Sequence, residues 1–490
     1  MKADSPLSAD EAGVFVKYLL LAGLDSAEIR YWRIHRHTDA GIAYRLQALL
    51  NDIAMTAATR LEAVPGIDWD ILGRSLATSA YYRRRIIELA LEAVLSEPLA
   101  PELCVKLASS SPDELSAVLP GTWHHAVIFA SPVCFTHELY PLIVDACVHD
   151  LERFGKPRTN VLAAHSDWLA GQGQLKRILY LDSSSGRFIE TDLDVPVRTD
   201  SVQFLCLGRE ERAMHAAMSQ SFACVQVNPA SVSRLADDKA ATLAAWSALG
   251  LDVPAYQEIA PGDWETAYCF LDRYTEIVAK PNQATEGELV AFFRRDQAHA
   301  RRELARHLEC CWAQGSAIVQ QRRDGVCFRN PVSGVKQSLA LRLNLAFDGE
   351  RHRVESGYAQ LGQDERHPAS CGRGGQLAAI DVALSGLTSG GKPIRLDVAD
   401  WNRICEQAER AADLFAGLLL MGLDVLLDRD LHGNISPVFL EANPRPAGLS
   451  HSRLLADDPF MPAQIGVSLK LWDCINPLTL SLSHDDASHY

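Results

Sequence analysis

The sequence has no excess of basic residues. Its 47 lysines and arginines are outnumbered by 62 aspartates and glutamates, which gives a formal net charge of -15 at pH 7. Nucleic acids and anionic membranes would repel such a chain, so neither is expected as a partner. A local basic pocket for nucleotide phosphates remains compatible with this balance.

Long apolar runs, paired cysteines and a secretion signal are also missing. The longest nearly apolar run, 414–427, is interrupted by Asp424 and is too short to span a bilayer. The twelve cysteines include no Cys-x-x-Cys pair, which is typical of thiols kept in a reducing compartment. Residues 1–10 show no charged-then-apolar pattern. We therefore expect a soluble, cytoplasmic protein.

Length and patterning indicate several domains. The chain has 490 residues, of which 48% are hydrophobic, enough for about three domains of usual size. Residues 1 to about 115 are predicted to be helical, with a capping-box pattern at Ser8-Ala-Asp-Glu11. From about 116 to 230, short apolar runs alternate with helical stretches, which predicts an α/β layer with parallel strands. These runs are 126–130, 177–181 and 202–206.

A hairpin near the end of the chain carries the most specific chemical signal. Strands are predicted at 422–427 and 438–443, with a polar turn between them that contains glycine and proline. Because side chains alternate faces along a strand, one face of the second strand should carry Phe439, Glu441 and Asn443.

Two carboxylates and an amide oxygen would meet on this face, because Asp424 on the first strand can reach Glu441 and Asn443. Magnesium suits such an all-oxygen site when it keeps waters and takes further ligands from phosphates. Arg445, just beyond the strand, has a five-donor fork suited to an anion. The alternative is a surface hairpin with ordinary polar residues.

Lys239 occupies an unusual position in a predicted helix. Asp237 or Asp238 can cap a helix that runs to about Leu249, and Gly250 is placed to end it. Lys239 then lies in the first turn, where a basic residue is unfavourable for the helix dipole. The position therefore has another use, or the side chain is simply solvated.

Lys280 ends a second strand, predicted at 276–280. The small and polar loop that follows includes Thr285 and Gly287, so its amides can approach a polyphosphate while the ammonium group neutralises charge. The loop is poor in glycine and contains Glu286, which makes the pattern weak by itself.

A clean alternation at 338–347 places leucines on one face and Arg342 and Asn344 on the other. The two polar side chains can bind an anion or form an ordinary solvent face. A further strand is predicted at 317–321. The loop 371–375 either closes over a site or is a plain connector.

Taken in order, these segments resemble the ATP-grasp superfamily, most closely its D-alanine–D-alanine ligase-like carboxylate–amine ligases. The resemblance covers about 228–465. It implies that ATP and Mg2+ are bound by the following residues: Lys239, Lys280, Thr285 and Gly287 at the phosphates; Gln320 and Gln321 at the adenine; Asp424, Glu441 and Asn443 at the metal; and Arg445 at a phosphate.

The sequence departs from the D-alanine ligases at several positions. Leu423 stands where those enzymes place an oxyanion-binding arginine, so Arg342 is the candidate for that duty. The ribose-binding glutamate is not evident, and Cys327 lies near its place. The hairpin between Asp424 and Glu441 is longer than in the D-alanine ligases. These differences favour another ligase of the superfamily.

The resemblance implies an α+β ATP-grasp fold, in which two α+β subdomains grip ATP. An α/β pre-ATP-grasp domain and a helical N-terminal extension would precede them. The expected domains are 1–115 (helical), 116–230 (pre-ATP-grasp), 231–316 (lid subdomain) and 317–490 (C-terminal subdomain with the Mg2+ site).

The implied activity is the formation of an amide or peptide bond between a small carboxylic acid and an amine through an acyl phosphate, with release of ADP and phosphate. Arg342 and Arg445 would stabilise the developing negative charge. A small-molecule kinase on the same fold and a non-catalytic ATP-binding scaffold are the alternatives. Dimers are common in such ligases, so a homodimer is a further expectation.

Overall fold

The computed structural model describes residues 104–119, 121–129, 136–182, 187–205, 211–283, 289–323, 325–331, 333–370, 375–430, 433–446 and 472. The described residues fall into two compact units, one within 1–140 and 160–199 and the other within 141–159 and 200–490. Most of the stretch predicted to be a helical extension lies outside the described residues. Among those described, no helix is both long and apolar enough to cross a membrane.

The first unit is built around a mixed sheet whose strand order is β1-β6-β5-β3-β2, with β4 paired to β5. β1 runs parallel to β6, whereas β5 runs antiparallel to both β6 and β3. The prediction of parallel strands is therefore wrong for β5. The strands are β1 (Cys104–Ser110), β2 (Trp123–Phe129), β3 (Thr159–His165), β4 (Leu169–Gly171), β5 (Gln174–Asp182) and β6 (Arg187–Arg198).

A strand, β1, occupies part of the stretch predicted to be helical. It is followed by helix α6 (Pro112–Val118), which begins at a capping box: the Ser111 hydroxyl accepts from the Glu114 N–H at 3.4 Å, and the Ser111 N–H donates to the Glu114 carboxylate at 2.8 Å. A short 3-10 turn, η2 (Ser166–Trp168), joins β3 to β4.

The second unit holds most of α7 (Thr136–Phe154), which lies within the stretch where helices were predicted to alternate with apolar runs. It continues with a parallel pair of strands and short helices that lead to the remaining sheets. These elements are β7 (Ser201–Leu205), α8 (Glu211–Ser219), β8 (Val225–Val227), α9 (Ala230–Ser233) and α10 (Lys239–Ala248).

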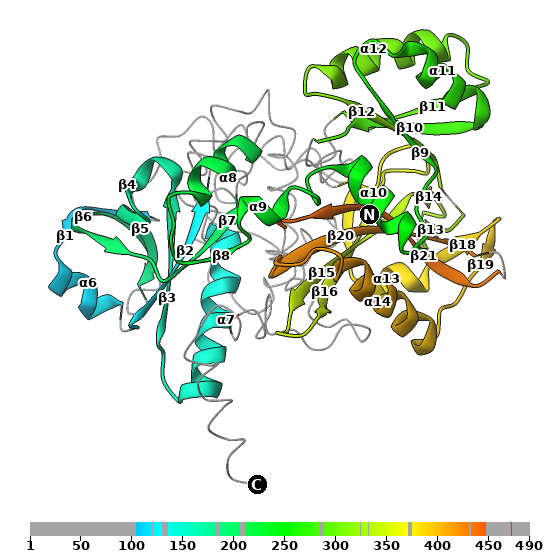
Figure 1. Ribbon diagram of the computed structural model, residues 1–490. Helices are drawn as coiled ribbons and strands as arrows, with labels where there is room; N and C mark the ends of the chain where they lie inside the picture. Colours follow the sequence, from blue (N-terminus) through cyan, green and yellow to red (C-terminus); the bar gives the residue numbers. More distant parts are fainter. Residues whose placement is uncertain are drawn as a thin grey trace, which may run out of the picture. The chain divides into compact units, whose positions relative to one another are not determined.

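A four-stranded antiparallel sheet of order β11-β10-β12-β9 forms a small α+β layer. Helices α11 and α12 cover one face of it (Figure 1), and their apolar side chains share a core with alternate residues of the strands. The elements are β9 (Tyr256–Ile259), α11 (Trp264–Arg273), β10 (Glu276–Pro281), β11 (Ala291–Arg294), α12 (Ala300–Trp312) and β12 (Ala317–Gln321).

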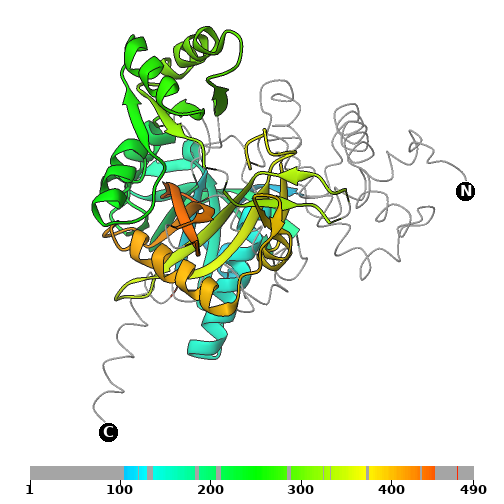
Figure 2. The same cartoon turned by 90° about the vertical axis from the view of Figure 1, so that its right-hand side faces the viewer.

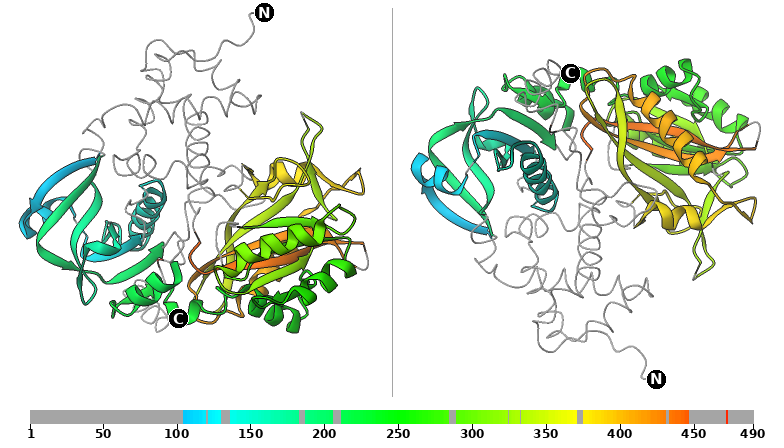
Figure 3. Two further views of the ribbon diagram at one scale, coloured as in Figure 1. Left: turned by 90° about the horizontal axis from the view of Figure 1, so that it is seen from above. Right: turned by 90° about the horizontal axis from the view of Figure 1, so that it is seen from below.

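A five-stranded antiparallel sheet of order β17-β16-β15-β20-β21 forms the larger layer. Helix α14 lies along one face of it (Figures 2 and 3). The alternating leucines of β15 point into the core on that face, as predicted. The elements are β15 (Leu339–Phe347), β16 (His352–Leu361), β17 (Gln376–Ala378), α13 (Ile380–Ser385), α14 (Val398–Ala412), β20 (Leu420–Arg429) and β21 (Ile435–Asn443).

A third sheet in this unit has four short strands in the order β14-β13-β18-β19. Its strands are β13 (Cys327–Arg329), β14 (Lys336–Gln337), β18 (Leu387–Ser389) and β19 (Lys392–Pro393).

The boundary between the two layers differs from the one expected at 316/317. β12 pairs with β10 and β9, so it belongs to the small sheet. α10 belongs to the core of the larger sheet, where Trp246 packs on Phe439 and donates its indole N–H to the Ala411 carbonyl at 3.0 Å. The helix that begins at Lys239 is thus fixed to the layer that carries Glu441. Asp238 caps it by accepting from the Ala241 N–H at 2.9 Å, as predicted.

Candidate active site

The face of the larger sheet opposite its apolar core carries a row of polar residues that crosses four strands. Tyr358 pairs with Arg342, Arg342 with Asp424, and Asp424 with Glu441. The neighbours of Arg342 and Asp424 along their own strands are buried leucines and a valine of the core on the other face. Alternation therefore directs the polar members of the row to one side.

A β-bulge in β21 sets which residues join this row. Asp424 pairs with Glu441, but Val425 pairs with Phe439, so one extra residue, Leu440, stands in β21. Phe439 and Ala442 both lie in the core. The prediction that Phe439 shares a face with Glu441 is therefore wrong, because the bulge shifts the alternation by one position.

Two lysines from different elements converge on Glu441. The ammonium nitrogens of Lys280 and Lys239 lie 3.3 Å and 3.7 Å from the same carboxylate oxygen, Oε2. All three side chains are largely buried, with exposed fractions of 8%, 10% and 19% for Lys280, Lys239 and Glu441. The sequence placed these residues in three separate segments, and the structure brings them together.

The charges around Glu441 affect one another. Burial raises the pKa of Glu441, but the ammonium groups of Lys280 and Lys239 outweigh it and hold the pKa well below its usual range. Burial lowers the pKa of Lys239, an effect that the Glu441 carboxylate opposes. Glu441 is thus an ionised carboxylate in a buried, electropositive setting.

Asp424 is held by the guanidinium of Arg342. Arg342 donates two parallel hydrogen bonds to it, Nε to Oδ1 at 2.5 Å and Nη2 to Oδ2 at 3.0 Å. The amide nitrogen of Asn443, Nδ2, donates to Asp424 Oδ2 at 3.4 Å. Burial raises the pKa of Asp424, and the nearby Glu441 carboxylate adds to this, although Arg342 acts in the opposite direction.

The donor set fits a magnesium ion. Among the described residues, no three His, Cys, Asp or Glu side chains cluster as a metal cage would require. Magnesium needs no such cage, because it is usually bound by one or two carboxylates with waters and phosphates. Asp424 and Glu441 supply carboxylate oxygens on neighbouring strands, as that mode of binding requires, and Asn443, farther along β21, carries an amide oxygen as well.

Gly422 makes room for Arg342. A methyl group at Gly422 would lie 3.0 Å from the Arg342 Cδ and 3.2 Å from its Nη1. Gly422 lies on β20 two residues before Asp424 and pairs with Asn344, which is two residues along β15 from Arg342. The arginine stem therefore passes over the bare backbone of β20.

Asn282 joins the segments that carry the two lysines. Its side chain accepts from the Ala240 N–H at 2.9 Å and donates to Asp238 at 3.1 Å. Its backbone carbonyl accepts from the Lys239 N–H at 3.3 Å. Asn282 is fully buried and lies two residues beyond Lys280, so it fixes the first turn of α10 against the end of β10.

Gln320 lies on the same face of the small sheet as Lys280. On β10 and β12, Ala279 and Val319 point into the core of the small layer, which directs Lys280 and Gln320 to the other face. Gln320 is 3% exposed, and its Nε2 has no hydrogen-bond partner among the described residues. A buried donor of this kind fits a ligand that carries an acceptor.

Three further nucleotide contacts were predicted in this region, at Gln321, Thr285 and Gly287. Gln321 is half-buried, and its backbone N–H donates to the Ala255 carbonyl at 2.7 Å. Thr285 and Gly287, together with Glu286, lie outside the described residues.

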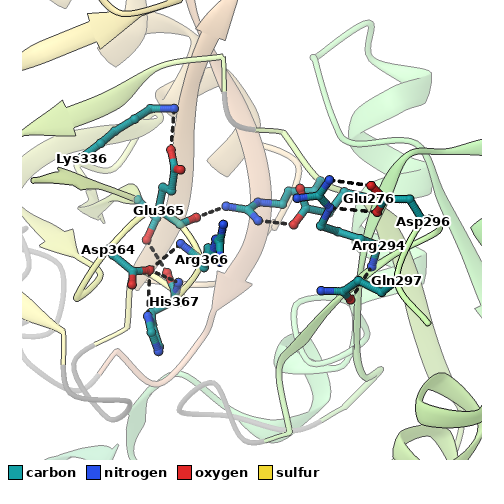
Figure 4. A network of polar contacts seen from close by, with 11 residues as sticks. Glu276, Arg294, Asp296, Gln297, Lys336, Asp364, Glu365, Arg366 and His367 are labelled. Carbon is teal, nitrogen blue, oxygen red and sulfur yellow. Dashed lines mark hydrogen bonds and ion pairs between the residues drawn. The ribbon is translucent and has the colours of Figure 1, made fainter. Parts of the chain in front are cut away.

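A loop after β16 is joined to the small sheet. The Asp364 carboxylate accepts two backbone N–H groups of its own loop, at 2.6 and 3.1 Å. Arg322, which follows β12, donates to the Glu276 carboxylate at the start of β10 and to the Glu365 carbonyl. Figure 4 shows Glu276, Asp364 and Glu365 in this network. This network holds the residues around Asp364 and Glu365, which precede the loop 371–375. Residues 371–374 of that loop lie outside the described residues.

Arg445 is not directed at the Asp424–Glu441 row. Its guanidinium donates to Asp237 at 2.5 and 3.2 Å and lies 3.0 Å from the His215 Nδ1. The side chain is 1% exposed. Burial and the charge of Arg445 lower the pKa of His215 to about 4, so this imidazole is neutral near pH 7.

Asn228 is a buried residue that bonds several backbone groups and was not singled out from the sequence. Its amide nitrogen donates to the carbonyls of Leu420 and Pro444, each at 2.5 Å, and its amide oxygen accepts from the Leu419 and Leu420 N–H groups at 2.6 and 3.3 Å. It thereby joins the start of β20 to the end of β21. No local motif marks it, because its partners lie far along the chain.

We expect Asn228→Ala to destabilise the protein by about 3 kcal/mol or more, because it leaves several buried backbone groups without partners. Asn434→Ala is the matched control, since Asn434 is exposed and its hydrogen bonds with Asp430 lie within its own turn; it should change stability by less than about 0.5 kcal/mol. Urea unfolding measures both. Equal, small shifts for the two variants would show that Asn228 does not join the strands as described.

Neither a protein-family model nor a curated protein matches the chain. Solved structures similar to it include the D-Ala:D-Ser ligase VanG from Enterococcus faecalis, with 15% identity, a TM-score of 0.45 and coverage of 73% of this chain and 99% of that one. The D-alanine-D-alanine ligase from Coxiella burnetii gives 12%, 0.44, 75% and 98%. The D-cycloserine synthetase DcsG gives 16%, 0.43, 72% and 99%. At identities this low, a function must be assigned from the site residues themselves.

Proposed function

We propose that this chain is an ATP-dependent ligase of the ATP-grasp kind, which joins a small carboxylic acid to an amine through an acyl phosphate. One observation carries the proposal: Lys239 and Lys280 meet at Glu441, which pairs across the sheet with Asp424. Burying charges of both signs at one place costs free energy. A magnesium-bound polyphosphate is a ligand that uses both signs.

The chemistry explains why both signs are needed. A carboxylate is a poor electrophile, so its oxygen first attacks the γ-phosphorus of ATP, and the bond from that phosphorus to the bridging oxygen of ADP breaks. The amine then attacks the acyl carbon, the amide bond forms, phosphate leaves, and the amine gives up a proton. Phosphoryl transfer of this kind depends on positioning and charge neutralisation.

The residues of the site divide this work. Asp424, Glu441 and Asn443 would hold magnesium, which neutralises phosphate charge when it is bound. Lys239 and Lys280 would bind the polyphosphate, exchanging their contacts with Glu441 for contacts with phosphate oxygens. Arg342, next to Asp424, would stabilise the charge that develops on the acyl phosphate and on the tetrahedral intermediate.

The contacts with the nucleotide base and the phosphate loop complete the proposal. Gln320, whose buried amide nitrogen has no partner in the described part of the chain, would contact the adenine together with Gln321. Thr285 and Gly287 would lie in the phosphate loop. Water would have to be excluded from the site during the reaction, because hydrolysis wastes the acyl phosphate. The partners would be a small acid and an amine, acting in a cytoplasmic protein that forms a homodimer.

We expect Mg-ATP to be converted to ADP and phosphate only in the presence of a particular acid–amine pair. The measurement is release of both products against a panel of amino acids and small carboxylates, tested singly and in pairs, with product masses recorded. The product should be lighter than the two substrates together by one water.

Other outcomes of this panel would decide against the ligase. ADP without phosphate, together with a phosphorylated small molecule, would identify a kinase. AMP and pyrophosphate would exclude the acyl-phosphate route. Tight ATP binding without release of any product across the panel would support a non-catalytic scaffold.

A further inference from the structure

A buried ion pair joins the segment before Lys239 to the segment after Asn443. Asp237 stands two residues before Lys239, and Arg445 stands two residues after Asn443. Two hydrogen bonds join their side chains, and the Asp237 side chain is 13% exposed. A bidentate arginine–carboxylate pair fixes both orientation and distance.

The pair rests on two further buried residues. His215, in α8, is 1% exposed and lies with its Nδ1 3.0 Å from Arg445 and its Nε2 2.8 Å from the Asn228 carbonyl. Since the imidazole is neutral, Nε2–H donates to that carbonyl and Nδ1 accepts from Arg445. Asn228 in turn bonds the backbone at Pro444, the residue before Arg445. Arg445 is thus held from both its side chain and its backbone.

The Asp237–Arg445 pair holds together the two segments that carry Lys239 and Glu441. Lys239 begins α10 beyond Asp237, Glu441 lies on β21 before Arg445, and their charged atoms are 3.7 Å apart. We propose that Asp237, Arg445, His215 and Asn228 form a positioning unit that holds Lys239 over the phosphate-binding end of the site, and that Arg445 does not itself contact phosphate. This inference rests on the proposed function and replaces the phosphate contact expected of Arg445 from the sequence.

The first experiment separates positioning from direct phosphate contact. We expect Asp237→Asn and Arg445→Met to lower kcat/KM for ATP by similar factors, on the order of tenfold to 100-fold, since a misplacement of about 1 Å can cost that much. The double variant should be no worse than the poorer single variant. If Arg445 contacts phosphate directly, Asp237→Asn should stay near the wild-type value while Arg445→Met falls, and that result overturns the proposal.

The second experiment asks whether the unit acts through Lys239. In a Lys239→Met background, adding Arg445→Met should change kcat/KM for ATP by less than about twofold, because the side chain being positioned is already gone. A purely structural role predicts the same loss in both backgrounds, and observing that would reject the proposal. Thermal melts of each variant check folding, and Arg445→Lys, which keeps the charge, should recover part of the loss.

Nucleotide binding distinguishes failure of this inference from failure of the proposed function. If the wild type binds Mg-ATP in calorimetry but ligates no acid–amine pair, the ligase proposal fails, and the same variants are compared by their Kd for Mg-ATP. Matching losses in Asp237→Asn and Arg445→Met that vanish in the Lys239→Met background would still support the positioning unit. Additive losses in Kd would overturn it.

Discussion

Glu441→Gln should lower ligase turnover by on the order of 100-fold or more, comparable to removing a group that stabilises transition-state charge. The amide keeps the size of the side chain but loses its negative charge, which stands 3.3 Å from Lys280 and 3.7 Å from Lys239. The substitution therefore weakens a magnesium ligand and leaves two buried ammonium groups without their carboxylate. Steady-state ADP release at saturating ATP measures the effect.

A second measurement tests the reason for that loss. The Mg2+ concentration for half-maximal rate should rise in Glu441→Gln, because a neutral amide binds magnesium less well than a carboxylate. Glu303→Gln is the matched control: Glu303 is exposed on α12, and its variant should keep wild-type turnover and Mg2+ dependence. Near wild-type turnover in Glu441→Gln would remove Glu441 from the metal site.

The hairpin and the leucine stripe show what the sequence predicts well. Each rests on strict alternation, which has a period of two and is read directly from residue types. β20 and β21 pair as an antiparallel hairpin, and the leucines of β15 fill the core opposite Arg342. Because both patterns are local in the sequence, they can be recognised without any knowledge of distant contacts.

The bulge at Leu440 shows where alternation fails. A single extra residue shifts the alternation of side chains by one position. Phe439 therefore points into the core, while Glu441 lies on the opposite face of the sheet. The apolar residues Phe439 and Ala442, three apart rather than two, were the available signal. A strand read residue by residue cannot place such a shift, because the bulge is set by pairing with β20.

The long-range polar contacts could not be predicted from the sequence, for a different reason. Arg445 and Asp237 are separated by 208 positions. The sequence suggested an anion site for Arg445 and a possible helix cap for Asp237, and neither suggestion pairs the two side chains. His215 and Asn228 carry no motif, and their roles appear only when α8, β8 and the ends of the hairpin come together. The antiparallel placement of β5 was missed similarly, since its apolar run resembles that of a parallel strand.

Arg342→Met should lower turnover by roughly 100- to 1,000-fold, the range seen when one donor to a developing oxyanion is removed. The guanidinium holds both oxygens of Asp424, and burial lowers the pKa of Arg342 while the Asp424 charge raises it by more, so the side chain stays charged. Arg342→Lys keeps that charge but loses the two-donor fork, so it should fall between Arg342→Met and the wild type. Turnover is measured as phosphate release with the identified substrate pair.

The Mg2+ dependence of these variants separates two ways in which Arg342 would act. If it stabilises the oxyanion directly, kcat falls while the Mg2+ concentration for half-maximal rate changes little. If it acts only by orienting Asp424, that concentration rises in step with the loss. Gly422→Ala gives an independent check, because its methyl group would displace the Arg342 stem by a few tenths of an ångström without removing any charge. It should reproduce part of the fall in kcat, and an unchanged kcat in both Gly422→Ala and Arg342→Met would exclude Arg342 from the reaction.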